Sequence, residues 1–142
     1  MTNVLNAYLA NLAVLQFKLH NLHWNVTGSL FVPVHEYTEK RYNVAFAQFD
    51  EVAEVLKMRG EMPRVTMAEY LEVATIKEVE GREFSDREVL DIVEADMRAM
   101  QEQTLAIRNA AAEADDFVVQ ALMEGYLSDY AKELWFLRSM KK

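Results

Sequence analysis

Residues 34–59 read VHEYTEKRYNVAFAQFDEVAEVLKMR and predict one long helix, because the run contains neither glycine nor proline. Gly28 and Pro33 bracket the turn that comes before it. We expect the helix to stop at Gly60, since glycine readily adopts the left-handed conformation found at helix C-termini. Pro63 lies just beyond and cannot continue a helix.

Two pairs of potential metal ligands lie on this predicted helix. Four-residue spacing places Glu39 on the same helical face as His35. The same spacing places Glu54 on the same face as Asp50. His35 and Asp50 are 15 residues apart, roughly 22 Å along the axis, so one metal site cannot include both pairs. At about 100° per residue, the two pairs nevertheless point to within roughly 60° of each other.

This spacing predicts a dimer with shared sites. If a second copy lay antiparallel across the middle of the helix, its acidic pair would meet the His35–Glu39 pair of the first copy. A twofold axis would then create two identical sites. His23, which precedes Trp24, adds a second imidazole. Two imidazoles and three carboxylates are donors that suit iron.

A metal pair held inside one subunit is the alternative arrangement. In a four-helix bundle that design needs Glu-x-x-His pairs projecting inward from two helices. The sequence contains no Glu-x-x-His, and all three histidines lie within residues 20–35. We therefore do not expect an intrachain di-iron site of that kind.

Apolar periodicity and capping patterns predict the remaining helices. The first covers about residues 3–27. Capping boxes at Thr66–Glu69 and Ser85–Glu88 open a short helix and a third long helix, and Asp115 or Asp116 can cap a fourth. The expected core positions are Leu5, Tyr8, Leu12, Leu15, Leu19 and Leu22 in the first helix, Val89, Val93, Met97, Met100 and Ile107 in the third, and Val119, Leu122, Tyr126, Tyr130, Leu134 and Leu137 in the fourth.

Four long helices, with a short one in the connection between the second and third, predict an all-α four-helix bundle. A chain of 142 residues with 51% apolar content can bury a core of its own, so we expect residues 1–142 to form a single domain. Without cysteine, the chain forms no disulfide and no thiolate metal site. No apolar run approaches the roughly 20 residues of a membrane span and no signal peptide is visible, so we expect a cytoplasmic protein.

The charge balance bears on nucleic-acid binding. The net charge is −8 and the sequence pI is near 4.9, which argues against a general phosphate-binding surface. The N-terminus has no basic residue before Lys18, and the C-terminus offers only Arg138, Lys141 and Lys142. Direct DNA binding through a basic tail is therefore not expected.

The run from His20 to Pro63, HNLHWNVTGSLFVPVHEYTEKRYNVAFAQFDEVAEVLKMRGEMP, resembles the core signature of the Dps family, the ferritin-like mini-ferritins. The segment Tyr130–Leu137, YAKELWFL, resembles the family's final helix. Two positions depart from the pattern. The acid at position 39 is glutamate, one methylene longer than aspartate, and Val55 stands where the family commonly has Arg.

The resemblance implies a ferritin-like bundle that assembles into a hollow dodecamer with ferroxidase centres at twofold interfaces. One subunit would contribute His23, His35 and Glu39, and its mate Asp50 and Glu54. It further implies oxidation of Fe²⁺, with hydrogen peroxide as the preferred oxidant, and storage of ferric iron that protects DNA. Zinc is a competing ion for the same ligands. Two alternatives stay open: a DNA-compacting shell with little ferroxidase turnover, and a shell whose centres hold another metal without turnover.

Several neighbouring residues have plainer interpretations. His20 is expected to be a surface or interface histidine, because the family's ligand is the histidine directly before Trp. Trp24 is interpreted as packing that fills the interface between subunits, with an oxidisable neighbour of the centre as the alternative. Asp115, Asp116 and Glu124 are expected to cap a helix or face solvent, and the resemblance offers a pore lining as the alternative. The eight methionines are interpreted as core residues.

Overall fold

The computed structural model describes residues 1–142 and confirms the predicted all-α class, since only two short strands interrupt the helices. In chain order the elements are α1 (Thr2–Asn25), β1 (Val26–Thr27), α2 (Phe31–Met58), α3 (Met67–Val73), β2 (Phe84–Ser85), α4 (Asp86–Glu113) and α5 (Phe117–Met140). No helix combines the length and the hydropathy that a membrane span requires.

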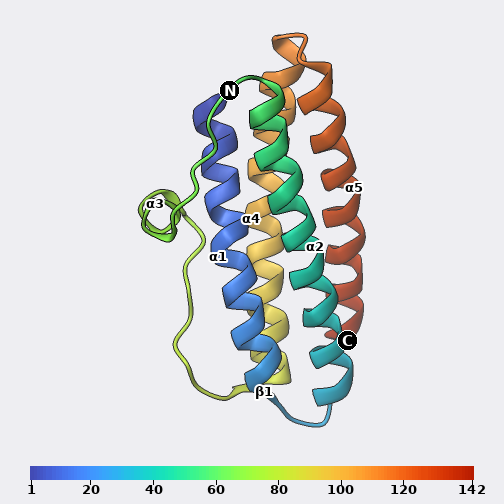
Figure 1. The fold of residues 1–142 in the computed structure, drawn as a ribbon. Coiled ribbons are helices and arrows are strands. Elements are labelled where there is room, and N and C mark those ends of the chain that lie inside the picture. Colours follow the sequence, from blue (N-terminus) through green and yellow to red (C-terminus); the bar gives the residue numbers. More distant parts are fainter. The chain divides into compact units, whose positions relative to one another are not determined.

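The chain divides into two compact units, Thr2–Val89 and Leu90–Lys142 together with Met1. In the first unit, α1 and α2 run side by side and α3 lies against α1 (Figure 1). All six core positions predicted for α1 are buried. Three- and four-residue spacing turns these side chains to one side of the helix, and their burial holds α1 in place.

The start of α2 differs from the prediction. The helix begins at Phe31, three residues before the predicted start, so Pro33 lies in its first turn rather than in the preceding turn. A proline is tolerated there because the first N–H groups of a helix have no intrahelical acceptor. Gly28 has a φ of +123°, and a Cβ there would lie 2.7 Å from a carboxylate oxygen of Asp86. That same oxygen accepts a hydrogen bond from the Leu30 N–H at 3.0 Å, so the turn needs glycine.

Both predicted capping boxes are present. Thr66 accepts a hydrogen bond from the N–H of Glu69, whose carboxylate accepts one in return from the Thr66 N–H. The Ser85 hydroxyl and the Glu88 carboxylate make the same reciprocal pair at distances of 3.1 and 2.8 Å. Gly60 has a φ of +76°, as expected just beyond the end of α2.

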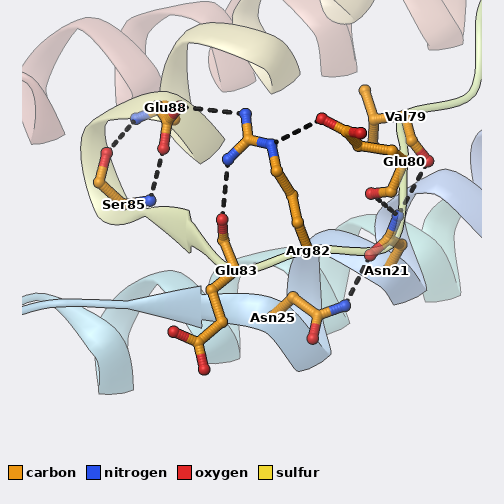
Figure 2. A network of polar contacts seen from close by, with 8 residues as sticks. All are labelled: Asn21, Asn25, Val79, Glu80, Arg82, Glu83, Ser85 and Glu88. Atoms are coloured by element: carbon orange, nitrogen blue, oxygen red, sulfur yellow. Dashed lines mark hydrogen bonds and ion pairs between the residues drawn. The ribbon is translucent and has the colours of Figure 1, made fainter.

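A two-residue parallel ladder, which no sequence pattern predicted, joins the segment after α1 to the segment before α4. Val26 pairs with Phe84 and Thr27 with Ser85. Arg82 holds the neighbouring loop in place (Figure 2). Its guanidinium contacts the carboxylates of Glu80 and Glu88, each at 3.1 Å, and donates a hydrogen bond to a main-chain carbonyl.

In the second unit, α4 and α5 are antiparallel. Arg108 pairs with Glu124 at 2.8 Å, and at the other end Lys141 pairs with Asp91 at 2.9 Å. Asp116 caps α5 by accepting a hydrogen bond from the N–H of Val119, as predicted. The predicted core positions of the third and fourth helices are buried, with one exception: Leu122 is half-buried.

Candidate metal centre

His23, in the last turn of α1, and His35, near the start of α2, form a stacked pair. Their ring centroids are 3.6 Å apart and their planes differ by 18°. Nδ1 of His23 lies 2.7 Å from the main-chain oxygen of His35, and Nδ1 of His35 lies 2.8 Å from the main-chain oxygen of His23. Each imidazole is therefore fixed by the backbone of the other residue.

These two hydrogen bonds determine which nitrogen of each imidazole can bind a metal. A carbonyl oxygen only accepts hydrogen bonds, so each Nδ1 must carry the proton. In a neutral imidazole the free lone pair then lies on Nε2, and neither Nε2 has a hydrogen-bond partner in the chain. Histidines that bind metals have this arrangement, with one ring nitrogen bound to protein and the other turned to the metal.

Burial favours the neutral form of His23. The residue is 6% exposed, and the loss of water lowers the pKa of His23 below its ordinary value of 6.5. The hydrogen bond to the His35 main chain opposes this shift, and the neighbouring His35 ring adds to it. Because only the neutral imidazole binds a metal, the lowered pKa favours metal binding in weakly acidic solution.

Thr38 supports this pair and was missed in the sequence. Its hydroxyl is fully buried and donates to the carbonyl oxygen of Val34 at 2.9 Å. The carbonyl oxygen of His35 lies within hydrogen-bond distance of the same hydroxyl, at 3.0 Å. Nδ1 of His23 lies 3.3 Å from the same hydroxyl oxygen, so the ring N–H is shared between Thr38 and His35. The only signal in the sequence is a threonine three residues after a candidate ligand, which has no meaning until His23 is placed beside it.

Glu39 is the third predicted ligand on this side, and Tyr42 holds it. The Tyr42 hydroxyl donates a hydrogen bond to Oε1 of Glu39 at 3.2 Å. Partial loss of water and the Glu39 carboxylate both raise the pKa of Tyr42 above its ordinary value, so the phenol remains a donor. Glu39 is close enough to His23 for its charge to act on that ring. Glu39 thus lies near the histidine pair, but the three side chains do not close around a single point.

Aromatic rings surround this group. Tyr42 stacks on His20 with centroids 3.8 Å apart and meets His23 edge-on at 5.3 Å. His20 bonds through Nδ1 to the carbonyl oxygen of Gln16 at 2.7 Å and is half-buried, and its interpretation as a surface or interface histidine stays a prediction. Trp24 lies 5.5 Å from His20 and is 68% exposed, so it is not packed within the chain.

Asp50 and Glu54 lie apart from the other ligands. Both are exposed, and neither makes a hydrogen bond or ion pair within the chain. No three His, Asp or Glu side chains of a single chain gather closely enough to hold a metal ion. The chain thus presents two partial ligand sets along α2. That the acids of a second copy complete the set stays a prediction, and the nitrogen and carboxylate donors present fit iron.

The remaining predicted residues have mixed outcomes. Asp116 caps α5, Glu124 pairs with Arg108, and Asp115 has a φ of 53° in the turn before α5. The interpretation of the methionines as core residues is wrong in part. The buried ones include Met97, Met100 and Met123, whereas Met58, Met62 and Met67 are mostly exposed. Met58 is the last residue of α2, Met62 follows that helix, and Met67 opens the short α3, which has no buried residue.

Comparisons with known proteins identify the family and the fold of this chain. A sequence model of the ferritin-like domain family matches residues 2–142. The "DNA protection during starvation protein" of Brevibacillus brevis is 36% identical over 136 residues, covering 96% of this chain and 91% of that protein. The crystal structure of antigen TpF1 from Treponema pallidum has a TM-score of 0.97 at 32% identity, covering 99% of this chain and 90% of that one.

A Dps protein from Vibrio cholerae O1, described as a member of a broad superfamily of ferritin-like diiron-carboxylate proteins, has a TM-score of 0.94. It is 28% identical, and the match covers 99% of this chain and 88% of that one. These likenesses confirm the predicted ferritin-like bundle with a short helix between its second and third long helices. The chain belongs to the Dps family of ferritin-like proteins.

Proposed function

We propose that this protein is an iron-sequestering mini-ferritin that oxidises Fe²⁺ at centres shared between two subunits. The observation that carries the proposal is the reciprocal fixing of His23 and His35, which leaves two unprotonated Nε2 atoms without a protein partner. A pair that served packing alone would have no need to keep both of these nitrogens free. Glu39 adds an anionic oxygen beside them.

A second copy would complete each centre with Asp50 and Glu54. These acids are exposed in one chain, and α2 places Asp50 roughly 22 Å along its axis from His35, as an antiparallel partner requires. Exposed apolar side chains lie on the same part of the first unit: Phe17 is 59% and Phe46 is 64% exposed. They border a recess that also includes His20 and Tyr42, so a partner helix could bury them. From the family resemblance we propose a cytoplasmic shell of twelve subunits.

The reaction follows from the ligand types. Carboxylate oxygens stabilise Fe³⁺ more than Fe²⁺ and so favour the loss of an electron. With hydrogen peroxide as oxidant, two Fe²⁺ each give one electron, the O–O bond breaks, and two further waters enter. The products are two FeO(OH) units and four protons. Consuming Fe²⁺ and peroxide together removes both reagents of hydroxyl-radical formation, and this protects DNA without binding to it.

The direct test is peroxide-driven oxidation of Fe²⁺ under anaerobic conditions. We expect fast oxidation by the unaltered protein and a loss of at least about a hundredfold in His35→Ala and in Asp50→Ala. Glu51→Ala is the matched control, because Glu51 is an exposed acid next to Asp50 that is absent from the proposed ligand set. Equal rates in all four proteins would overturn the proposal.

Mixing the two inactive variants tests whether the centre is shared. In a dimer of one His35→Ala chain and one Asp50→Ala chain, one site carries both changes and the other carries neither. Random reassembly of equal amounts should therefore restore about a quarter of the original activity. A site built within one chain would regain none. Gel mobility of plasmid DNA, with and without Mg²⁺, tests the alternative of a DNA-compacting shell, and added Zn²⁺ should inhibit by competing for the ligands.

A further inference from the structure

We infer that Tyr42 is a positioning residue for the metal centre: its hydroxyl holds one oxygen of Glu39 and leaves the other oxygen to bind the metal. The inference rests on the proposed function, because it assigns a role relative to the ligands proposed there. It concerns how the glutamate is held, which the ligand set itself leaves open.

The contact geometry carries the first step. Tyr42 follows Glu39 by three residues on α2, so the two side chains are neighbours on one helical face. The hydroxyl donates to Oε1 at 3.2 Å, and Oε2 has no hydrogen-bond partner. A phenol can only donate to a carboxylate, so this bond occupies a lone pair of Oε1 and directs Oε2 to other partners.

The Tyr42 ring is itself fixed. One face stacks on His20, with centroids 3.8 Å apart and planes that differ by 17°. An edge contact with His23 follows at 5.3 Å and 88°. His20 is held in turn by its bond to the Gln16 carbonyl oxygen at 2.7 Å. The hydroxyl therefore projects from an aromatic cluster anchored on α1, not from a freely rotating side chain.

Exposure makes this anchor useful. Glu39 is exposed, and a free glutamate must give up much rotamer freedom when it binds a metal. A hydrogen bond formed before the metal arrives reduces that loss and keeps the carboxylate near the imidazoles. Of the three acids proposed as ligands, only Glu39 has such an anchor within the chain, since Asp50 and Glu54 make no hydrogen bond or ion pair. The Glu39 carboxylate reaches the Tyr42 hydroxyl, whereas an aspartate at this position has one methylene fewer and would hold its carboxylate further from it.

The test uses Tyr42→Phe, which removes the hydroxyl and keeps the ring. The matched control is Tyr70→Phe, because the Tyr70 hydroxyl also makes one hydrogen bond, to the Arg64 carbonyl oxygen at 2.7 Å, away from the histidines. Co²⁺, which peroxide-free buffer leaves unoxidised, serves as the probe, and its visible absorption reports coordination. We expect Tyr42→Phe to weaken Co²⁺ binding by about threefold to tenfold, the worth of one hydrogen bond, and to change the spectrum.

Kinetics add a second readout. Tyr42→Phe should raise the KM for Fe²⁺ by a similar factor and change kcat less, because the anchor mainly prepares the ligand before metal binding. Tyr70→Phe should match the unaltered protein in affinity, spectrum and KM. Tyr42→Phe that also matched it in all three would overturn the inference.

A double-mutant cycle separates positioning from a loss of folding. Glu39→Asp withdraws the carboxylate from the Tyr42 hydroxyl, so adding Tyr42→Phe to Glu39→Asp should weaken Co²⁺ binding by less than twofold more. Additive losses would overturn the inference. His35→Ala distinguishes the two proposals. If it abolishes Co²⁺ binding while Tyr42→Phe leaves binding unchanged, only the inference on Tyr42 fails. If His35→Ala binds Co²⁺ as the unaltered protein does, the proposed function fails as well.

Discussion

The two halves of α2 contribute to the proposed centre in different ways. In the N-terminal half, His35 is fixed by the main chain of α1, Thr38 supports the contact, and Tyr42 holds Glu39. In the C-terminal half, Asp50 and Glu54 are exposed and make no bond within the chain. Folding of one chain thus orders one half of the ligand set. The other half keeps its side-chain entropy until assembly or metal binding orders it.

Removing an imidazole from the ordered half should have the largest effect. His23→Ala deletes a proposed ligand together with the ring that stacks on His35, so we expect Fe²⁺ oxidation to fall by at least about a hundredfold. Glu54→Gln, in the other half, keeps the size and an oxygen donor, and we expect a fall of about tenfold. Stopped-flow absorbance over a range of Fe²⁺ concentrations measures both. Equal losses would show that the charge of Glu54 matters as much as the imidazole of His23.

The second-largest effect is expected from a pair of threonine variants, which separates a contribution to metal binding from a contribution to folding. Thr38→Val removes a fully buried hydroxyl that contacts both histidines, and Thr104→Val removes another, which donates to the Met100 carbonyl oxygen at 2.6 Å. Each variant should lower the free energy of unfolding by about 1–2 kcal/mol. Only Thr38→Val should also weaken Co²⁺ binding, by about tenfold.

Urea unfolding and Co²⁺ titration of both threonine variants measure these effects. Thr104→Val tests the comparison directly, because its hydroxyl is equally buried and bonds to a carbonyl in the same manner. If Thr38→Val lost stability without losing Co²⁺ affinity, the hydroxyl would serve folding alone, and the N-terminal half of α2 would be less specialised than we propose.

The same contrast explains what the sequence could predict. The acidic pair Asp50–Glu54 and the capping boxes follow from spacing within one helix, so local pattern is enough to find them. Thr38 and Tyr42 have roles only because α1 brings His23 and His20 beside them. Those contacts join residues 15 and 22 positions apart in the sequence, so no periodicity within one helix could reveal them.

The sequence predicts the fold incorrectly at two places, the start of α2 and the β1–β2 ladder. The turn signal of Gly28 and Pro33 predicts a start of α2 at residue 34, yet a proline in the first helical turn breaks no hydrogen bond, and the helix begins at Phe31. The β1–β2 ladder is two residues long on each side, which is too short for any alternation to show. In both cases the deciding contacts come from distant residues, such as Asp86 beside Gly28.

Lowering the pH should reduce the free energy of unfolding of the metal-free protein through His23. Because burial lowers the pKa of His23, the folded protein binds a proton here less readily than the unfolded chain does. The stability that this group contributes is complete above the unfolded pKa near 6.5 and is lost as the pH falls through the lower folded pKa. His23→Gln should therefore flatten the pH dependence of unfolding below pH 6.5 in metal-free protein.

His20→Gln is the control for this pH effect, because it removes a histidine one turn earlier in α1 and leaves the stacked pair intact. We expect this variant to keep the loss of stability below pH 6.5 that the unaltered protein shows. Urea unfolding at closely spaced pH values, with a chelator present, measures both variants. An unchanged pH profile in His23→Gln would contradict the assignment.

The smallest effect on stability is expected at the two acids whose carboxylates have no hydrogen bond or ion pair within the chain. Asp50→Asn and Glu54→Gln should each change the free energy of unfolding of metal-free protein by no more than about 0.5 kcal/mol, since neither carboxylate has a partner in the chain. Adding Co²⁺ at a hundred times its Kd should stabilise the unaltered protein by about 2.7 kcal/mol. At that same Co²⁺ concentration both variants should gain less, because their affinity is lower. Calorimetry with and without Co²⁺ measures the difference. A metal-free variant that lost several kcal/mol would mean that these acids already hold the fold together, and the contrast between the two halves of α2 would not stand.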